Sequence, residues 1–355
     1  MPRIISEEVD IFKLPATMAF KGSENQITIG DLHGNAMKLM FLLVAHQIAT
    51  ITEEDYLALV KIYKTPEEQL TAQYLEEFNE ILGRITFNPG INITLIGDEL
   101  ADRGSNDYFT LKILQKLKRE GVPVEIIFSN HSMDFIECYE IYQHFDAKKR
   151  HLDYSVMLEL DADDKKVSKE RKTWPGLGEY QARSMQNLQL LVDNNFVSME
   201  EIKTIIQDVY KPSLRAISYS LNEDKTEITI FSHAGIGLTI IKDLAKKLAV
   251  EYKDTTVEDL AQTIEDINKR FLIHLINNTI HTLYDPDKLD TAGEPYPDDV
   301  PFERIAWNRH YKDLDRPDDH SGYKVCFVHG HDSYDPKKAH IYNLDTALGR
   351  VVMRF

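Results

Sequence analysis

Side chains that can bind a metal ion follow several short apolar runs of this chain. They are Asp31 and His33 after residues 27–29, Asp98 after 91–96, Asn130 and His131 after 124–128, His233 after 228–231, and His331 after 325–328. Carboxylate, amide and imidazole groups without a thiolate favour Mn, Fe or Zn over a calcium site or a closed structural zinc site. The Asp31-x-His33 spacing lets both side chains contact one ion, and Asp98 has two oxygens with which to bridge two ions. The pattern therefore predicts a metal centre.

The apolar runs before these side chains have the composition of β-strands. They are rich in β-branched residues and lead into Gly, Ser or other polar residues, as strands do where they enter a loop. In sheets with crossover helices, ligands bind at the carboxyl ends of the strands. We therefore expect an α/β fold whose strand ends bring these side chains together.

Segments with helical periodicity separate the predicted strands. Thr65 to Glu68, Ser198 to Glu201 and Thr255 to Glu258 each have the order of a capping box, and apolar residues at helical spacing follow each one. Gly83 stands where the first of these helices would end. No clean linker divides the chain, so we expect one core with helical insertions at about 52–88 and 136–220.

The composition excludes several classes of protein. Of the 355 residues, 58 are acidic and 41 basic, and the net charge of −17 argues against a nucleic-acid partner. Two cysteines, Cys138 and Cys326, form neither a disulfide framework nor a CxxC metal motif. The most apolar stretch, Met37 to Ile51, is interrupted by polar residues, so no transmembrane segment is predicted. An acidic start with no apolar run gives no Sec-type signal, and we expect a soluble, cytoplasmic protein.

Taken in order, the motifs resemble those of the calcineurin-like metallophosphoesterases, and specifically of their phosphoprotein phosphatase (PPP) branch. The matching segments are Gly30 to Gly34 (GDxHG), Gly97 to Gly104 (GDxxDRG with one extra residue), Asn130-His131 (GNHE), Ser232 to Gly235 (HAG), Trp307 to Arg309 (WxR), Gly330-His331 (GH) and Leu344 to Thr346 (LDT). They occur in the family's order and extend over residues 27–348. This resemblance implies a β-sandwich flanked by helices, in a catalytic domain that covers residues 18–355.

The same resemblance implies roles for individual residues. Two divalent metal ions, Mn in the first place with Fe or Zn as alternatives, would be bound by Asp31, His33, Asp98, Asn130, His233 and His331. A hydroxide bridging the ions would attack phosphorus. The substrate phosphate would be bound by Arg103, Arg309 and Asn130. His131 would protonate the leaving oxygen, and Asp102 would orient its imidazole.

Some positions depart from the family pattern. Ser129 and Ser132 stand where the family has Gly and Glu around Asn130-His131, and His329 adds an imidazole that we interpret as packing or as support for His331. Together with the helical insertions, these variants resemble the Wip-type phosphatases, secreted virulence effectors that an intracellular bacterial pathogen delivers into host cells by type IV secretion. This narrower resemblance implies a protein translocated into a host cell, with a host protein as partner.

The sequence is compatible with three functions. The first is a protein phosphatase, a metal-dependent phosphomonoesterase acting on phosphoserine, phosphothreonine or phosphotyrosine in a phosphoprotein substrate. The second is hydrolysis of a dinucleotide or another small phosphoanhydride by the same fold. The third is an effector that acts mainly by docking a host protein through its helical insertions.

Overall fold

Two β-sheets contain the strands that the sequence predicts. The computed structural model describes residues 8–18, 25–104, 106–136, 179–284, 299–309, 314–332 and 338–345. The first sheet is parallel and runs in the order β1 (Gln26–Ile29), β4 (Asn92–Leu95), β5 (Val124–Ile127), β6 (Leu214–Arg215). The second has the parallel strands β8 (Glu227–Phe231), β10 (Tyr323–His329) and β11 (Ile341–Asn343), with β7 (Ser218–Leu221) antiparallel to β8 and β9 (Asp319–His320) antiparallel to β10. A short pair, β2 (Ala49–Thr50) and β3 (Thr86–Phe87), lies outside both sheets.

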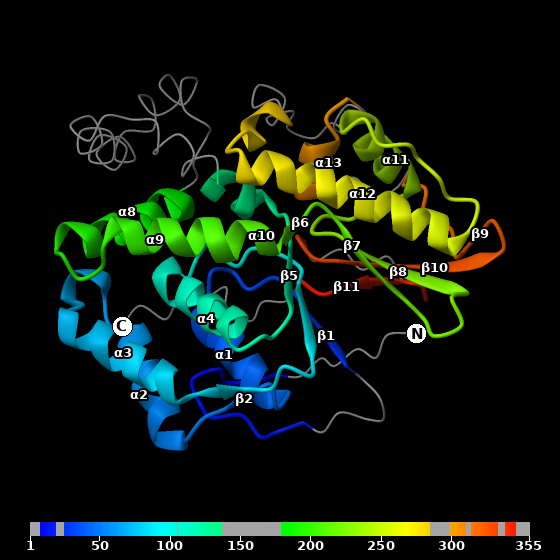
Figure 1. Ribbon diagram of the computed structural model, residues 1–355. Coiled ribbons are helices and arrows are strands. Elements are labelled where there is room, and N and C mark those ends of the chain that lie inside the picture. The colour runs from blue at the N-terminus through cyan, green and yellow to red at the C-terminus, as the bar shows by residue number, and fades with distance from the viewer. Residues whose placement is uncertain are drawn as a thin grey trace.

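Helices flank the two sheets on opposite sides. They are α1 (Ala36–Ala45), α2 (Glu53–Lys64), α3 (Ala72–Arg84), α4 (Asp107–Arg119), α8 (Glu179–Asp193), α9 (Met199–Ile205), α10 (Lys211–Ser213), α11 (Leu238–Lys247), α12 (Val257–Ile276) and α13 (Pro301–Trp307). Figure 1 shows α11, α12 and α13 along the second sheet, and α1 and α4 beside the first. The mixed α/β architecture with flanking helices confirms the predicted fold class.

Apolar side chains fill the space between the sheets. Ile96 and Ile127 from the first sheet form a buried cluster with Phe231 and Val328 from the second. Phe271 of α12 packs at 5.1 Å from Phe128, which follows β5, and stacks at 5.5 Å on Phe302 of α13 (ring centroids). Burying each such side chain contributes about 1.5–3 kcal/mol to the free energy of folding, and together they hold the two sheets in one unit.

Two of the three predicted helix starts differ from the structure. Thr65 ends α2, and α3 begins only after Thr71, whose hydroxyl accepts a hydrogen bond from Tyr74 N. The intervening residues form a 3-10 turn, Glu67–Gln69, and Gly83 is the next-to-last residue of α3, one position before the helix ends. The capping box of α12 is formed by Thr256 and Asp259, one residue later than predicted. Ser198 caps α9 as expected.

The described parts of both predicted insertions are mainly helical. Residues 52–88 contain α2 and α3, and Tyr63 of α2 donates a hydrogen bond to Gly104 O (3.2 Å) in the Asp98 loop. Of the second stretch, residues 137–178 lie outside the described residues. Residues 179–213 are largely helical, and they include a π-helical turn, Ile206–Tyr210. The next residues form β6 and β7, so this helical part ends at residue 213 rather than at 220.

Residues before the predicted start of the domain also pack on the core. Ile11 is buried, and its carbonyl accepts a hydrogen bond of 2.7 Å from the hydroxyl of Tyr56 in α2. Among the described helices, we find none with the length and apolar character of a membrane span. The described secondary structure also includes a helix at residues 130–136, directly after β5, and the 3-10 turns Glu67–Gln69 and Ile280–Thr282.

Candidate metal centre

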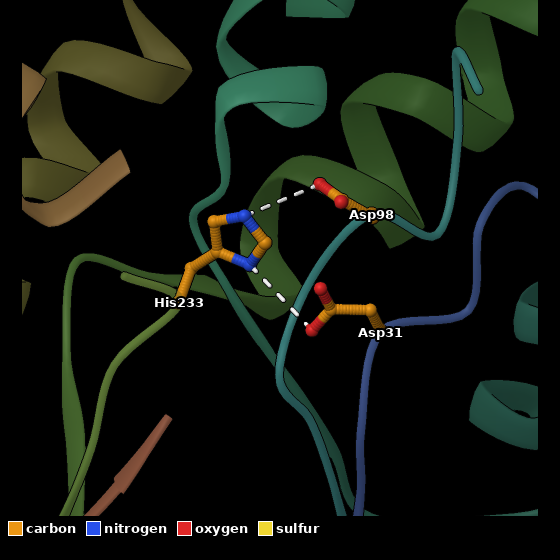
Figure 2. Close-up of side chains that lie close together, drawn as sticks. All are labelled: Asp31, Asp98 and His233. Atoms are coloured by element: carbon orange, nitrogen blue, oxygen red, sulfur yellow. Dashed lines mark ion pairs between the residues drawn. The ribbon is translucent and has the colours of Figure 1, made fainter. Parts of the chain in front are cut away.

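The side chains predicted to bind metal meet at one edge of the two sheets. They follow the carboxyl ends of β1, β4 and β5 in the first sheet and of β8 and β10 in the second. Figure 2 shows Asp31, Asp98 and His233 pointing toward one another from three separate segments. Asp31 and His233 are fully buried, and Asp98 is 5% exposed. The parallel strand order therefore assembles residues that lie far apart in the sequence.

His233 occupies the centre of this cluster. Its Nδ1 donates a hydrogen bond to the carbonyl of Ile96 (3.0 Å), so its Nε2 presents a lone pair. Facing that lone pair are Asn130 Oδ1 at 2.9 Å, His331 Nδ1 at 3.1 Å and Asp98 Oδ1 at 3.4 Å. A carbonyl hydrogen bond that fixes one ring nitrogen and frees the other is the usual arrangement of a metal-binding histidine.

The distances between these atoms fit donors that share one cation. Ligand atoms about 2.0–2.2 Å from an ion lie about 3 Å apart in octahedral and about 3.5 Å apart in tetrahedral geometry. The separations of 2.9, 3.1 and 3.4 Å around His233 Nε2 fall in that range. Oxygen and nitrogen donors without thiolate suit Mn, Fe or Zn.

Asp98 is shared by two groups of potential ligands. One contains Asp31, Asp98 and His233, and the other contains His33, Asp98 and Asp102; within each, the ligand atoms lie within 4.8 Å of one another. In the first group, Asp31 Oδ2 accepts a hydrogen bond from His331 N (2.8 Å). The oxygens Asp31 Oδ1 and Asp98 Oδ1 are buried and have no hydrogen-bond partner among the described residues. Buried carboxylate oxygens without a hydrogen-bond partner are expected where a cation binds.

The electrostatics also indicate a site that needs positive charge. Burial raises the pKa of Asp31 to about 6; the nearby His233 opposes this, while Asp98 and Asp345 add to it. Burial lowers the pKa of His33, but hydrogen bonds to Asp102 and Asp345 outweigh it and raise the pKa to about 9. The carboxylates thus recruit protons where no cation is present, and divalent ions would replace those protons.

Close backbone packing surrounds the cluster. Gly97 has a φ of 123°, and a Cβ there would lie 2.7 Å from both His233 Nδ1 and Ser129 Cβ. A Cβ on Gly330 would overlap the Asp31 carboxylate. Both motif glycines are therefore required by space, and Gly97 is required by its conformation as well.

The loop from Asp98 to Gly104 accommodates its extra residue through left-handed backbone. Asp98 and Ala101 have φ values of 53° and 54°, a conformation uncommon for residues other than glycine. Asp107, the first residue of α4, accepts a hydrogen bond from Ala101 N (3.0 Å to each oxygen). The carbonyl of Ala101 in turn accepts one from His131 Nδ1 (2.7 Å). Ala101 is thus held on both sides.

His131 and Asp102, the predicted acid and its partner, are both buried beside the cluster. His131 Nε2 lies 3.7 Å from Asp102 Oδ1, which is longer than a hydrogen bond. Burial lowers the pKa of His131, but the charges of Asp98 and Asp102 outweigh it, so the pKa is raised. Arg103, whose side chain is 35% exposed, donates from Nη1 to both Asp102 oxygens (2.9 and 3.0 Å).

Arg309 and His329 differ in exposure. Burial, His233 and the exposed Arg309 together lower the pKa of His331. His329 is 1% exposed at the end of β10, and its Nδ1 lies 3.0 Å from Gly330 O. Burial lowers its pKa to about 4, which leaves the ring neutral. These contacts agree with a packing or supporting role for His329.

Comparison with known proteins identifies the family. The family model of the WipA-like phosphatase domain matches residues 92–350, which is most of the chain. The chain belongs to the WipA-like phosphatase family. The crystal structure of the phosphatase domain from the Legionella effector WipB is similar, with a TM-score of 0.71 and 33% sequence identity over 90% of this chain and 100% of that chain. No curated protein is significantly similar in sequence. The predicted resemblance to Wip-type effector phosphatases is thereby confirmed.

Several residues of this WipA-like domain that contact the site were not singled out from the sequence. Asp345 of the LDT motif has Oδ1 3.4 Å from His33 Nε2, and Lys38 of α1 donates to the carbonyl of Asp31. Glu99 and Tyr210 form a buried hydrogen bond behind Asp98. Asp345 and Glu99 lie within matched motifs, whereas Lys38 and Tyr210 carry no signal in a single sequence.

Proposed function

We propose that this WipA-like domain is a metal-dependent phosphomonoesterase of the calcineurin-like PPP type, with phosphoproteins as substrates. The observation that carries the proposal is that Asp98 belongs to both groups of buried ligand atoms. One carboxylate shared by two such groups is what a two-metal hydrolase needs. The ligands in this proposal are Asp31, His33, Asp98, Asn130, His233 and His331.

The remaining residues have distinct roles in this proposal. When bound, two divalent ions, Mn in the first place, supply an activated water and neutralise phosphoryl charge. Arg309 reaches the phosphate from the exposed rim, and Arg103 binds it while holding Asp102. The amide of Asn130 also faces the phosphate. His131, whose Nδ1 is engaged by Ala101 O, uses its Nε2 to protonate the leaving oxygen.

A protein substrate is supported by the nature of the relative. The similar WipB domain comes from a Legionella effector. On this ground we propose that this chain is also translocated into a host cell and acts on a host phosphoprotein there. The net charge of −17 favours a protein over a nucleic-acid partner.

The test is phosphate release from phosphoserine, phosphothreonine and phosphotyrosine peptides by chelated protein to which Mn, Fe or Zn is returned. We expect activity only with metal, and its loss in Asp98→Asn. Asp254→Asn, which changes a carboxylate paired with His320 of β9 (2.8 Å), is the control and should stay active. Hydrolysis of diadenosine tetraphosphate but of no phosphopeptide would assign the phosphoanhydride reaction instead. Full activity after chelation would contradict the metal mechanism.

A further inference from the structure

A buried hydrogen-bond network lies directly behind the candidate metal ligands. We call it the Glu99 network, and it consists of Glu99, Ser129, Ser132 and Tyr210. All four residues are fully buried. Glu99 Oε1 accepts hydrogen bonds from Ser132 Oγ (3.0 Å) and from the Tyr210 hydroxyl. Ser132 Oγ lies 2.9 Å from Ser129 Oγ. The network joins the Asp98 loop, the helix at 130–136 and the π-turn Ile206–Tyr210.

The direction of the hydrogen bonds follows from the number of lone pairs. Ser129 Oγ accepts from Asp98 N (3.1 Å) and from Ser132 N (3.0 Å). A hydroxyl has two acceptor lone pairs and one donor, so the Ser129 O–H donates to Ser132 Oγ. The Ser132 O–H then donates to Glu99, as Tyr210 does. Every donor therefore points toward the Glu99 carboxyl group, which is the terminal acceptor.

Ser129 fixes the backbone of two candidate ligands with one hydroxyl. It caps the helix at 130–136, because its side chain accepts from Ser132 N and its carbonyl from Met133 N (2.8 Å). That cap sets the position of Asn130, the first residue of the helix. The bond from Asp98 N holds Asp98 in its left-handed conformation, with φ at 53°. A glycine at 129, as in the family motif, has no side chain with which to do either.

Two departures from the PPP motifs meet in this network. The extra residue in the Asp98 loop brings Glu99 next to Ser132, at the position where the motif has a glutamate. Tyr210 reaches the same carboxyl group from the helical segment 179–213, and its ring packs edge-on against Phe135 at 5.7 Å. π-turns are rare and often mark functional sites, and this one directs Tyr210 inward. The helical segment is thus connected to the metal ligands by hydrogen bonds.

We propose that the Glu99 network is a positioning device: its residues hold Asp98 and Asn130 in the geometry that binds metal, and Tyr210 extends that support to the helical segment. The inference rests on the proposed function, because it takes Asp98 and Asn130 as metal ligands. Groups that orient metal ligands typically change metal affinity by about tenfold to a hundredfold when removed. Metal affinity is therefore the property on which the proposal depends.

The experiment measures Mn affinity of the chelated full chain by titration calorimetry. Ser129→Ala should lower the affinity by about tenfold to a hundredfold, and Tyr210→Phe by about tenfold, the lower end of that range. The double variant should bind no more weakly than Ser129→Ala alone, because both changes interrupt one network. Hydrogen exchange of the peptide that contains Asp98 should be faster in each variant. These readouts do not require an active enzyme.

A second tyrosine provides a matched control. Tyr252 donates a hydrogen bond to Asp254 Oδ2 (2.9 Å), and the carbonyl of Asp254 accepts one from Tyr323, the first residue of β10, whereas His331 follows the end of that strand. Tyr252→Phe should keep wild-type Mn affinity even if it unfolds at a lower temperature. The positioning role would be wrong if Ser129→Ala and Tyr210→Phe both bound Mn as tightly as the wild type. It would also be wrong if the losses of Mn affinity in the two single variants multiplied in the double variant. If Asp98→Asn itself bound Mn normally, the proposed function would fail instead.

Discussion

Asp102 lies closer to His33 than to His131. Its Oδ2 is 3.3 Å from His33 Nδ1, while its Oδ1 is 3.7 Å from His131 Nε2. The other nitrogen of His33, Nε2, is 3.4 Å from Asp345 Oδ1. Asp102 therefore contacts a candidate metal ligand as well as the candidate acid, and its role is wider than orienting His131.

Asp102→Asn should reduce metal affinity as well as turnover. The amide has no charge, so it binds His33 more weakly and lacks the negative charge to which Arg103 donates. Loss of an outer partner of this kind costs about tenfold to a hundredfold in metal affinity. Calorimetric titration of the chelated variant with Mn would measure this.

The alternative for Asp102 gives a different pattern. If the residue acted only through His131, Asp102→Asn would bind Mn like the wild type and lose turnover alone. Asp254→Asn, with its carboxylate–histidine pair outside the site, controls for the loss of charge. The Mn affinity of Asp102→Asn therefore distinguishes a role at His33 from a role at His131 alone.

The sequence predicted those parts of the site that depend on local signals. Strand runs followed by metal-binding side chains placed Asp31, Asp98 and His233 at one sheet edge, and the structure brings them together. Helix starts were less accurate, since Thr255 and Thr256 are equally good caps by type and only the geometry selects Thr256. Local composition determines whether a helix or a strand forms, but packing determines at which residue it begins.

Contacts between distant residues could not be predicted from one sequence. Tyr210 and Glu99 are 111 positions apart, and nothing in the residues around Tyr210 indicates a buried partner. The extra residue in the Asp98 loop was visible in the sequence, but its accommodation by left-handed Asp98 and Ala101 was not. Such features depend on the fold as a whole rather than on a local pattern.

Arg309→Lys should lower kcat/KM by about tenfold to a hundredfold. A lysine offers a point charge instead of a planar fork, and the loss of one hydrogen bond to a charged group is worth about 1.5–3 kcal/mol. Because Arg309 is exposed, folding and metal binding should be unchanged. Steady-state kinetics would measure the fall in kcat/KM, and inhibition by free phosphate would measure how tightly the variant binds phosphate. Arg84→Lys, at an exposed arginine that contacts both oxygens of Asp55 (3.2 and 2.5 Å), is the matched control.

Arg103→Lys should have a second effect that Arg309→Lys lacks. Arg103 donates to both oxygens of Asp102, so its replacement also releases the carboxylate beside His33. We therefore expect lower Mn affinity together with lower kcat/KM. Unchanged Mn binding in this variant would mean that Asp102 is held without Arg103.

His131→Ala should affect substrates according to their leaving groups. General-acid help is worth about 10²–10⁴ in rate, and a serine alkoxide needs it most. A tyrosine phenolate, with a pKa of about 10, needs it less, and an activated aryl phosphate needs it hardly at all. Hydrolysis of phosphoserine peptide should therefore fall far more than hydrolysis of nitrophenyl phosphate. Equal losses on all three, at unchanged metal content, would assign His131 to phosphate positioning.

Asp107 should make the unfolding free energy depend on pH. Burial, with a contribution from Glu99, raises its pKa to about 8 despite the hydrogen bond from Ala101 N. Between about pH 4 and pH 8 the folded chain keeps a proton that the unfolded chain, with an aspartate pKa near 3.9, has lost. Stability therefore falls as the pH rises through this window, by at most about 1.4 kcal/mol per unit, and is constant above it.

Asp107→Asn should remove that dependence, because the amide is neutral at every pH and still accepts from Ala101 N and from the hydroxyl of Ser184. In urea unfolding of chelated protein, the variant should gain stability over the wild type steadily from pH 5 to pH 8. Asp266→Asn is the control, since the hydrogen bond from Lys269 lowers the pKa of that exposed acid, and it should show no such gain. A difference between Asp107→Asn and wild type that stays constant across this range would mean that Asp107 is ionised in the folded protein throughout, with Ala101 N–H and Ser184 sufficient to hold its charge.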